Sequence, residues 1–384
     1  MDLKSMRSDA AALTRRFLDN WTHFLAIHLA VSVLVFTILT PLASLLLRFA
    51  VTLSGNAALS DQDILFFALT PVGFVSLLLL GSVFSIILFL GHAALLVVAE
   101  SSSHGETPSV KRTLLFLAGR ATGLFRLALL VLLRVLLNLL PFLLLLLLIY
   151  RLLLSDYDIN FYLAEKPPEW QLAVALGALV ALACAANLLR LFINWVFCLP
   201  LLIFSGRSPR QALADSAQAA RGHRAAIGTW LLAWLLGGLL LTAAVSVLVT
   251  LAGSYLVPVS AGSIKALLAV LGLASLVGFL LYFAVTFAAS SWLSLLIMKL
   301  FNDRGLRGEM RPLSADDAAS RYPLLADRRV VAWGLLAGLV VSLLLTWLLI
   351  ERLQIETASA VMAHRGASTA APENTIAAVQ LAID

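Results

Sequence analysis

The chain has 384 residues, of which 61% are hydrophobic and only 12% are charged, and its mean hydropathy is +0.98. This composition excludes a soluble globular domain and predicts an integral membrane protein, because each crossing of ~30 Å of hydrocarbon needs ~20 mostly apolar residues. The net charge of +6 does not indicate nucleic-acid binding. Most basic residues lie in short connections between apolar runs, where they orient spans and meet anionic headgroups.

Seven apolar segments predict an all-α polytopic membrane domain over residues 1–350. They lie near 22–47, 64–98, 124–153, 171–204, 226–256, 265–298 and 330–350. Several exceed the length of a perpendicular crossing, so tilted or bent helices are expected. The candidate bend points are Pro41, Pro71, Pro141 and Pro200. No removable signal peptide is predicted, because no short apolar core with a small-residue cleavage site follows the basic N-terminus.

The seventh segment, 330–350, has the features of a membrane span with an aromatic residue at each headgroup layer. It carries tryptophans near its two ends, at Trp333 and Trp347, and these suit the two headgroup layers. Its Gly334 and Gly338 form a GxxxG, which either allows another helix to approach closely or is an ordinary pair of glycines in an apolar helix. In the fourth segment, Cys184 and Cys198 stand too far apart along one helix to form a disulfide with each other.

Basic residues alternate between connections and so predict the orientation. The N-terminal tail and the second, fourth and sixth connections hold nineteen lysines and arginines, whereas the intervening connections hold four. Because positive connections stay in the cytoplasm, the N-terminus is expected inside and everything after Ile350 outside. The predicted location is a bacterial inner or plasma membrane.

The basic connections also suggest an internal repeat. A helical segment begins near Pro108 and again near Pro209, each with an arginine twelve residues later and then a new span. The same separation, counted back from Pro108, leads to Arg7, where another helical segment precedes a span. One interpretation is three copies of interfacial helix, span, outer loop and span, with the seventh span added; the other is chance similarity among helix-forming connections.

Two arginines stand inside apolar runs without an acidic residue nearby in sequence. Arg134 and Arg190 lie in the third and fourth segments, where a central arginine costs ~2.5–3.5 kcal/mol. Asn138 lies one turn from Arg134, and Asn187, Arg190 and Asn194 recur at helical spacing, so each arginine lies on a polar stripe that should face other helices or a wet cavity. The arginines either bind an anionic phosphate or lipid headgroup, or extend to the membrane boundary and bond carbonyls and asparagines.

The last twenty-five residues, AVMAHRGASTAAPENTIAAVQLAID, carry a different signal. They resemble the start of the glycerophosphodiester phosphodiesterase domain, with a short strand ending in HRG, a small-residue loop and PENT opening a helix. The matching residues are His364, Arg365, Gly366, Pro372, Glu373, Asn374 and Thr375. Local chemistry agrees, because Pro372 suits the first turn of a helix and Glu373 complements its positive start.

The resemblance implies that residues 351–384 are the first βα unit of a truncated TIM barrel, whose site would lie at the C-terminal ends of its strands. His364 would be an acid/base group, Arg365 would hold the substrate phosphate, and Glu373 and Asn374 would support the site. A divalent metal, Ca²⁺ or Mg²⁺, is implied, with ligands beyond this chain. The chain is therefore expected to be a piece of a longer protein and inactive alone.

Residues 1–350 are loosely similar to the membrane domain that precedes this catalytic domain in some bacterial members. The implied function is a membrane-tethered enzyme that hydrolyses glycerophosphodiesters to sn-glycerol 3-phosphate and an alcohol outside the cytoplasm. The alternative is a transporter, scramblase or lipid-binding module with an accessory enzyme. The expected partners are the lipid bilayer and a phospholipid-derived substrate, without nucleic acid; the sequence does not indicate an oligomeric state.

Overall fold

The computed structural model describes residues 3–54, 67–105, 109–260 and 262–306, and the single positions Val340, Leu344, Ile376 and Gln380. The chain divides into two units, Met1–Gly338 and Leu339–Asp384, and the fold described here is that of the first. All regular structure in the four described ranges is helical. Six of these helical stretches are long and apolar enough to cross a membrane, which confirms the helical membrane domain. The predicted seventh span, its glycine pair and the predicted barrel strand lie outside these ranges.

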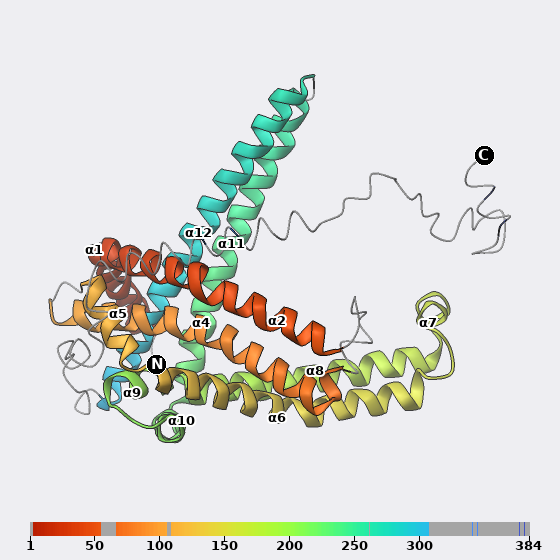
Figure 1. Ribbon diagram of the computed structural model, residues 1–384, viewed down its shortest axis with the longest axis horizontal. Coiled ribbons are helices and arrows are strands. Elements are labelled where there is room, and N and C mark those ends of the chain that lie inside the picture. Colours follow the sequence, from red (N-terminus) through yellow and green to blue (C-terminus); the bar gives the residue numbers. More distant parts are fainter. Residues whose placement is uncertain are drawn as a thin grey trace. The chain divides into compact units, whose positions relative to one another are not determined.

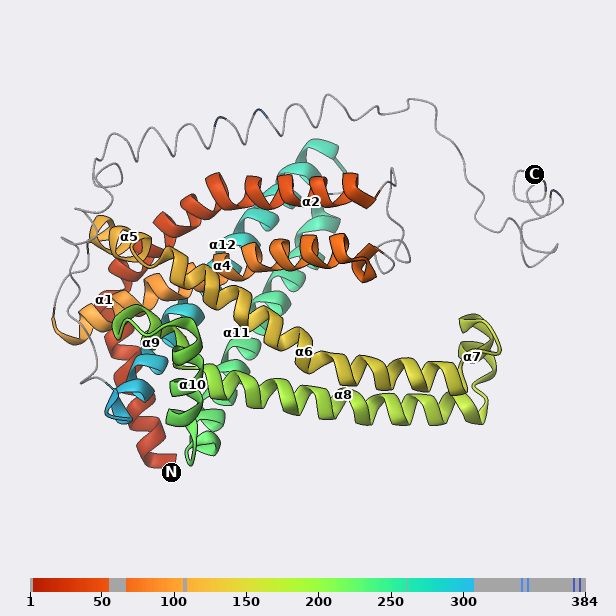
Figure 2. The same cartoon turned by 60° about the horizontal axis from the view of Figure 1, so that its bottom comes forward.

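The long helices form three antiparallel pairs (Figure 1). In the first pair, α1 (Leu3–Leu34) continues through a π-helical turn (Val35–Leu39) into α2 (Thr40–Ser54), and α4 (Pro71–Ser103) returns. The second pair is α6 (Ala121–Leu153) and α8 (Pro168–Trp195), joined through the short α7 (Ile159–Glu165). The third is α11 (Arg224–Ser260) and α12 (Ile264–Asp303). Figure 2 shows the same pairs diverging from a shared end.

Three short helices connect the pairs at that shared end: α5 (Val110–Ala118), α9 (Cys198–Phe204) and α10 (Pro209–Ala220). Local sequence explains where α10 begins. Ser208 is its N-cap and forms a reciprocal capping box with Gln211, and Pro209 occupies the first helical position, where no N–H is needed. A short amphipathic helix thus precedes both α6 and α11, as the repeat predicts.

The predicted proline bends have different outcomes. Pro71 is not a bend: it begins α4 directly after the N-cap Thr70, whose hydroxyl accepts from the Gly73 N–H at 3.0 Å. Pro141 lies within the continuous α6. The helical geometry changes just before Pro41, where the π-helical turn ends at Leu39, and just before Pro200, where α8 stops at Trp195 and α9 starts at Cys198. A proline removes a backbone donor, so the chain rearranges on its N-terminal side.

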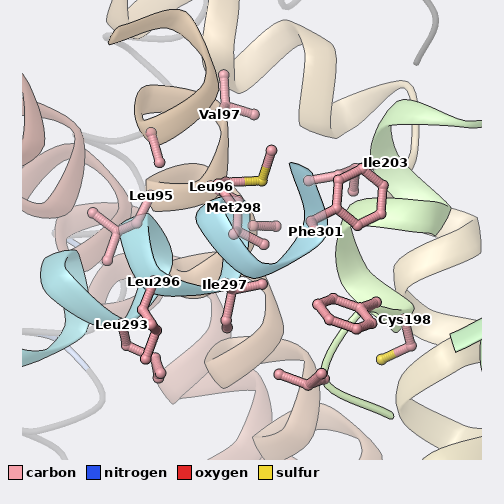
Figure 3. Close-up of a cluster of buried hydrophobic side chains, with 14 of the residues drawn as sticks. Leu95, Leu96, Val97, Cys198, Ile203, Leu293, Leu296, Ile297, Met298 and Phe301 are labelled. Carbon is pink, nitrogen blue, oxygen red and sulfur yellow. The ribbon is translucent and has the colours of Figure 1, made fainter. Parts of the chain in front are cut away.

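The main buried core lies at the shared end of the helices, which we call the core end. It is built from one face of α1, the last turns of α4, α8 and α12, the first turns of α6 and α11, and the short helices α5, α9 and α10. Figure 3 shows Leu96 and Val97 of α4, Ile203 of α9, and Met298 and Phe301 of α12 meeting there. Phe197 and Phe301 contact with ring centroids 6.0 Å apart.

Beyond the core end, the same helices present large apolar side chains on their surface. In α6, Leu124 and Leu127 are buried, but Leu143 to Leu148 are 40–58% exposed. The exposed portions fit the lipid-facing part of a membrane protein, because ~20 helical residues span the hydrocarbon. Each long helix therefore has a core-packed part and a lipid-facing part, and α6, with 33 residues, is ~50 Å long, well beyond one membrane thickness.

Three glycines at the core end support the repeat. Gly105, Gly206 and Gly305 follow the ends of α4, α9 and α12 and have φ of 69°, 64° and 69°. This left-handed conformation terminates a helix and favours glycine, which has no Cβ to clash. Because the three glycines recur at intervals of about 100 residues, the second span of each copy ends in the same way.

Candidate functional site

The predicted polar stripe lies between the two helices of the second pair. Arg134 and Asn138 are on α6, and Asn187, Arg190 and Asn194 are on α8. The Asn187 side chain donates to Asn138 Oδ1 at 3.5 Å, and Asn138 donates to the Arg134 carbonyl at 2.7 Å. The asparagines thus bond to each other and to backbone.

The register of the pair places the two arginines at the same level. Asn138 and Asn187 lie opposite each other in the antiparallel pair. Arg134 is one turn before Asn138 on α6, and Arg190 is about one turn after Asn187 on α8. Both steps lead toward the core end. A Cβ added at Gly177 would lie 4.0 Å from the Leu146 side chain, which fits this register. The two arginines therefore stand at one level of the α6–α8 pair.

That level is the boundary between the core-packed and lipid-facing parts. Leu130 and Val131 still pack against the core, whereas Leu136 and Leu137 are already exposed. On α8, Ile193 is buried, and Arg190 itself is exposed. The sequence predicts arginines well inside the spans, and the structure places them where the core-packed part of each helix gives way to its exposed apolar part. A boundary position costs far less than a central one.

One turn nearer the core, Asn194 is the centre of a hydrogen-bonded junction. Its side chain accepts from Arg224 Nε of α11 at 2.8 Å, and its carbonyl accepts from the Ser216 hydroxyl of α10 at 2.7 Å. Ser216, fully buried, also accepts from the Phe197 N–H at 3.1 Å. Ser216 thereby provides a hydrogen-bond partner for the Phe197 N–H and for the Asn194 carbonyl, two backbone groups at the break between α8 and α9.

The charges at this level are not balanced by acids. Ion pairs elsewhere in the described ranges join Arg207 to Asp215 at 3.2 Å and Lys299 to Asp9 at 3.1 Å and to Asp303 at 2.7 Å. In the same ranges no carboxylate pairs with Arg134, Arg190 or Arg224, and the first two make no side-chain hydrogen bond there. The site is therefore cationic and faces the membrane boundary.

Sequence reasoning missed two members of this site. Arg224 was counted among the basic residues of a connection, and Ser216 was one small residue in a helix rich in alanine. The recurrence of Asn187, Arg190 and Asn194 at helical spacing was the available signal, because a polar side chain at the core end needs a partner from another helix.

The residues of the C-terminal motif, His364, Arg365, Glu373 and Asn374, lie outside the described residues. Within the described ranges, no three His, Cys, Asp or Glu side chains are grouped closely enough to hold a metal ion. The implied Ca²⁺ or Mg²⁺ therefore has no candidate ligand set in this part of the chain, and we derive no chemical step through it.

The fold and this site define a polytopic helical membrane domain with a cationic site at the boundary of the second helix pair. Residues 10–319 match the family described as the membrane domain of glycerophosphoryl diester phosphodiesterase. Because the match covers most of the chain, the protein belongs to that family. The search of curated proteins and the search of solved structures gave no match. The HRG and PENT motifs lie beyond the matched residues.

Proposed function

We propose that this chain anchors a glycerophosphodiester phosphodiesterase in the membrane and that its C-terminal segment begins the catalytic domain. The observation that carries the proposal is the order of the two signals. A membrane domain of this phosphodiesterase family covers residues 10–319, and the HRG and PENT motifs follow it from His364.

The proposed reaction is hydrolysis of a glycerophosphodiester to sn-glycerol 3-phosphate and an alcohol. A phosphodiester resists attack because its negative oxygens repel a nucleophile and its alkoxide is a poor leaving group. Arg365 would offset charge with its planar guanidinium fork, and His364 would transfer protons to or from the reacting oxygens. A Ca²⁺ or Mg²⁺ ion, held by carboxylates beyond this chain, would offset more of the phosphate charge.

The test uses the full-length protein that contains this chain. His364→Ala should lower turnover of glycerophosphocholine by about 10²–10⁴, which is the usual contribution of general acid/base catalysis. His223→Ala is a matched control, because His223 is an exposed histidine of the membrane domain. Wild-type turnover in folded His364→Ala would contradict the assigned role.

A second variant separates charge from geometry at the neighbouring position. Arg365→Lys retains the positive charge but loses bidentate contact with phosphate, so KM should rise or turnover should fall. Arg151→Lys, at an exposed arginine of α6, is the control and should leave both constants unchanged. Equal kinetics for Arg365→Lys and wild type would argue against phosphate binding by Arg365.

The alternative, a transporter, scramblase or lipid-binding module with an accessory enzyme, has one structural observation in its favour. The boundary site of α6 and α8 is cationic and open to the lipid-facing surface. It supports lipid binding more directly than transport, because binding requires only an accessible headgroup site.

A further inference from the structure

The paired arginines of α6 and α8 have no counterpart in the other two helix pairs. The repeat offset of about 100 residues places Val33 and Phe89 at the same level of the first pair, and Leu235 and Ser291 at that level of the third. In the first pair, Ala43 and Leu80 share a buried cluster, which fits that alignment. The architecture is therefore compatible with apolar or small residues here, and it does not require two arginines.

Their placement is also costly unless an anion is near. Two guanidinium groups at one level of packed helices repel each other, and Arg224 adds a third positive charge one turn away through Asn194. At the edge of the hydrocarbon, screening by water is weaker than on a soluble surface. Because no carboxylate in the described ranges offsets this charge, an anion from the surroundings is the natural counter-charge.

The exposed leucines next to this level predict that its surroundings are lipid headgroups. Arg190 is exposed on α8, and the lipid-facing leucines of α6 begin at Leu136, directly beyond the arginines. A phospholipid whose acyl chains lie along those leucines would bring its phosphate to the guanidinium level. Arginine offers phosphate a planar pair of donors, and each such charge-assisted contact is stronger than a neutral hydrogen bond.

We propose that Arg134, Arg190 and Arg224 form a binding site for the phosphate of an anionic phospholipid from the leaflet next to the core end. Arg134 and Arg190 bind the phosphate directly. Arg224 is held by Asn194 and adds positive charge from the core side. The asparagine contact between Asn138 and Asn187 sets the register that keeps the two direct ligands level. This proposal does not depend on the diesterase activity.

The test is native mass spectrometry of the protein released from nanodiscs of equimolar phosphatidylcholine and phosphatidylglycerol. Wild type should retain phosphatidylglycerol selectively, and Arg134→Gln and Arg190→Gln should each reduce that retention about ten-fold or more. Arg151→Gln is the matched control, because Arg151 is an exposed arginine in the last turn of the same helix. It should retain the lipid as wild type does.

Three outcomes would overturn the proposal. One is equal loss of lipid in Arg151→Gln, which would indicate general attraction to positive charge. Another is unchanged retention in both glutamine variants. The third is displacement of the lipid by soluble sn-glycerol 3-phosphate, which would assign the site to a water-soluble phosphate. If a glutamine variant does not fold, Arg190→Lys retains the charge and should still lose selectivity because it lacks the fork.

Discussion

Ser216 is the residue on which the break in the fourth span depends. Its hydroxyl donates to the Asn194 carbonyl and accepts from the Phe197 N–H in a fully buried position. Ser216→Ala would leave both backbone groups without this partner, so it should lower the free energy of unfolding by about 1–3 kcal/mol. Thermal unfolding of the detergent-solubilised protein measures the loss.

The control for this change is Ser254→Ala, because the Ser254 hydroxyl bonds only to Leu251 of its own helix and the residue is exposed. It should unfold within about 0.5 kcal/mol of wild type. If Ser216→Ala unfolds at the same temperature as Ser254→Ala, the α8–α9 break does not need the serine.

Glycine substitutions should have opposite effects at two kinds of position. Gly305 has a φ of 69° at the end of α12, so Gly305→Ala should cost about 1–2 kcal/mol because an L side chain clashes in that conformation. Gly237 lies within α11, where an added Cβ would meet no atom within 4 Å. Gly237→Ala should stabilise the helix by about 1 kcal/mol or less. Equal effects on the unfolding temperature would contradict the left-handed helix ends.

At the residue scale, the sequence alone predicts part of the candidate site. It singled out Arg134 and Arg190, since charges in apolar runs are conspicuous, and it singled out the asparagines from their helical spacing. Binding of a phosphate by these arginines stays a prediction. It could not identify the Asn194, Ser216 and Arg224 junction, which joins α8, α10 and α11. Such contacts depend on how helices distant in sequence pack, and a one-dimensional pattern does not contain that information.

At the scale of the elements, each long helix combines two environments. Leu96 of α4 is fully buried in the core, whereas Leu144 of α6 is 56% exposed on the lipid-facing part. Leu96→Ala should therefore cost about 2–5 kcal/mol by opening a cavity. Leu144→Ala should change stability little, because lipid chains can fill the space and are as apolar as leucine. Denaturation by a graded detergent series compares the two, and equal losses would contradict the two-part helices.

The same duality explains why the predicted span edges were imperfect. The sequence predicted a span over 22–47, but one helical stretch covers Leu3–Ser54. A buried protein core and a hydrocarbon layer both select apolar residues, so hydropathy cannot mark the point where one replaces the other. Burial in three dimensions marks it. By burial, Arg134 and Arg190 lie where the core-packed parts of α6 and α8 end and their exposed apolar parts begin.

For the whole molecule, the described basic connections share one end. Lys111, Arg112, Arg210 and Arg221 are exposed on or next to α5 and α10, which pack at the core end. We expect that end to face the cytoplasm, because positive connections are retained there. In intact cells, a membrane-impermeant maleimide should label Asp156→Cys, placed in the opposite connection, but should label His223→Cys only after permeabilisation.

Both variants would be made in a background with Cys184→Ala and Cys198→Ala, which removes the two native thiols. Both introduced positions are exposed, so accessibility to the reagent depends on the side of the membrane. Labelling of His223→Cys in intact cells would reverse the predicted orientation.

The proposed membrane-tethered phosphodiesterase is tested most directly by the side of the membrane on which the full-length protein acts. Spheroplasts that contain it would be given glycerophosphocholine, which does not cross the bilayer, and release of sn-glycerol 3-phosphate would be measured before and after lysis. We predict equal release in both states, with His364→Ala inactive in each, because the predicted seventh span, added to the six helices long enough to cross, would place the proposed catalytic domain on the side opposite a cytoplasmic N-terminus. Release that appears only after lysis, or that persists in folded His364→Ala, would contradict the account.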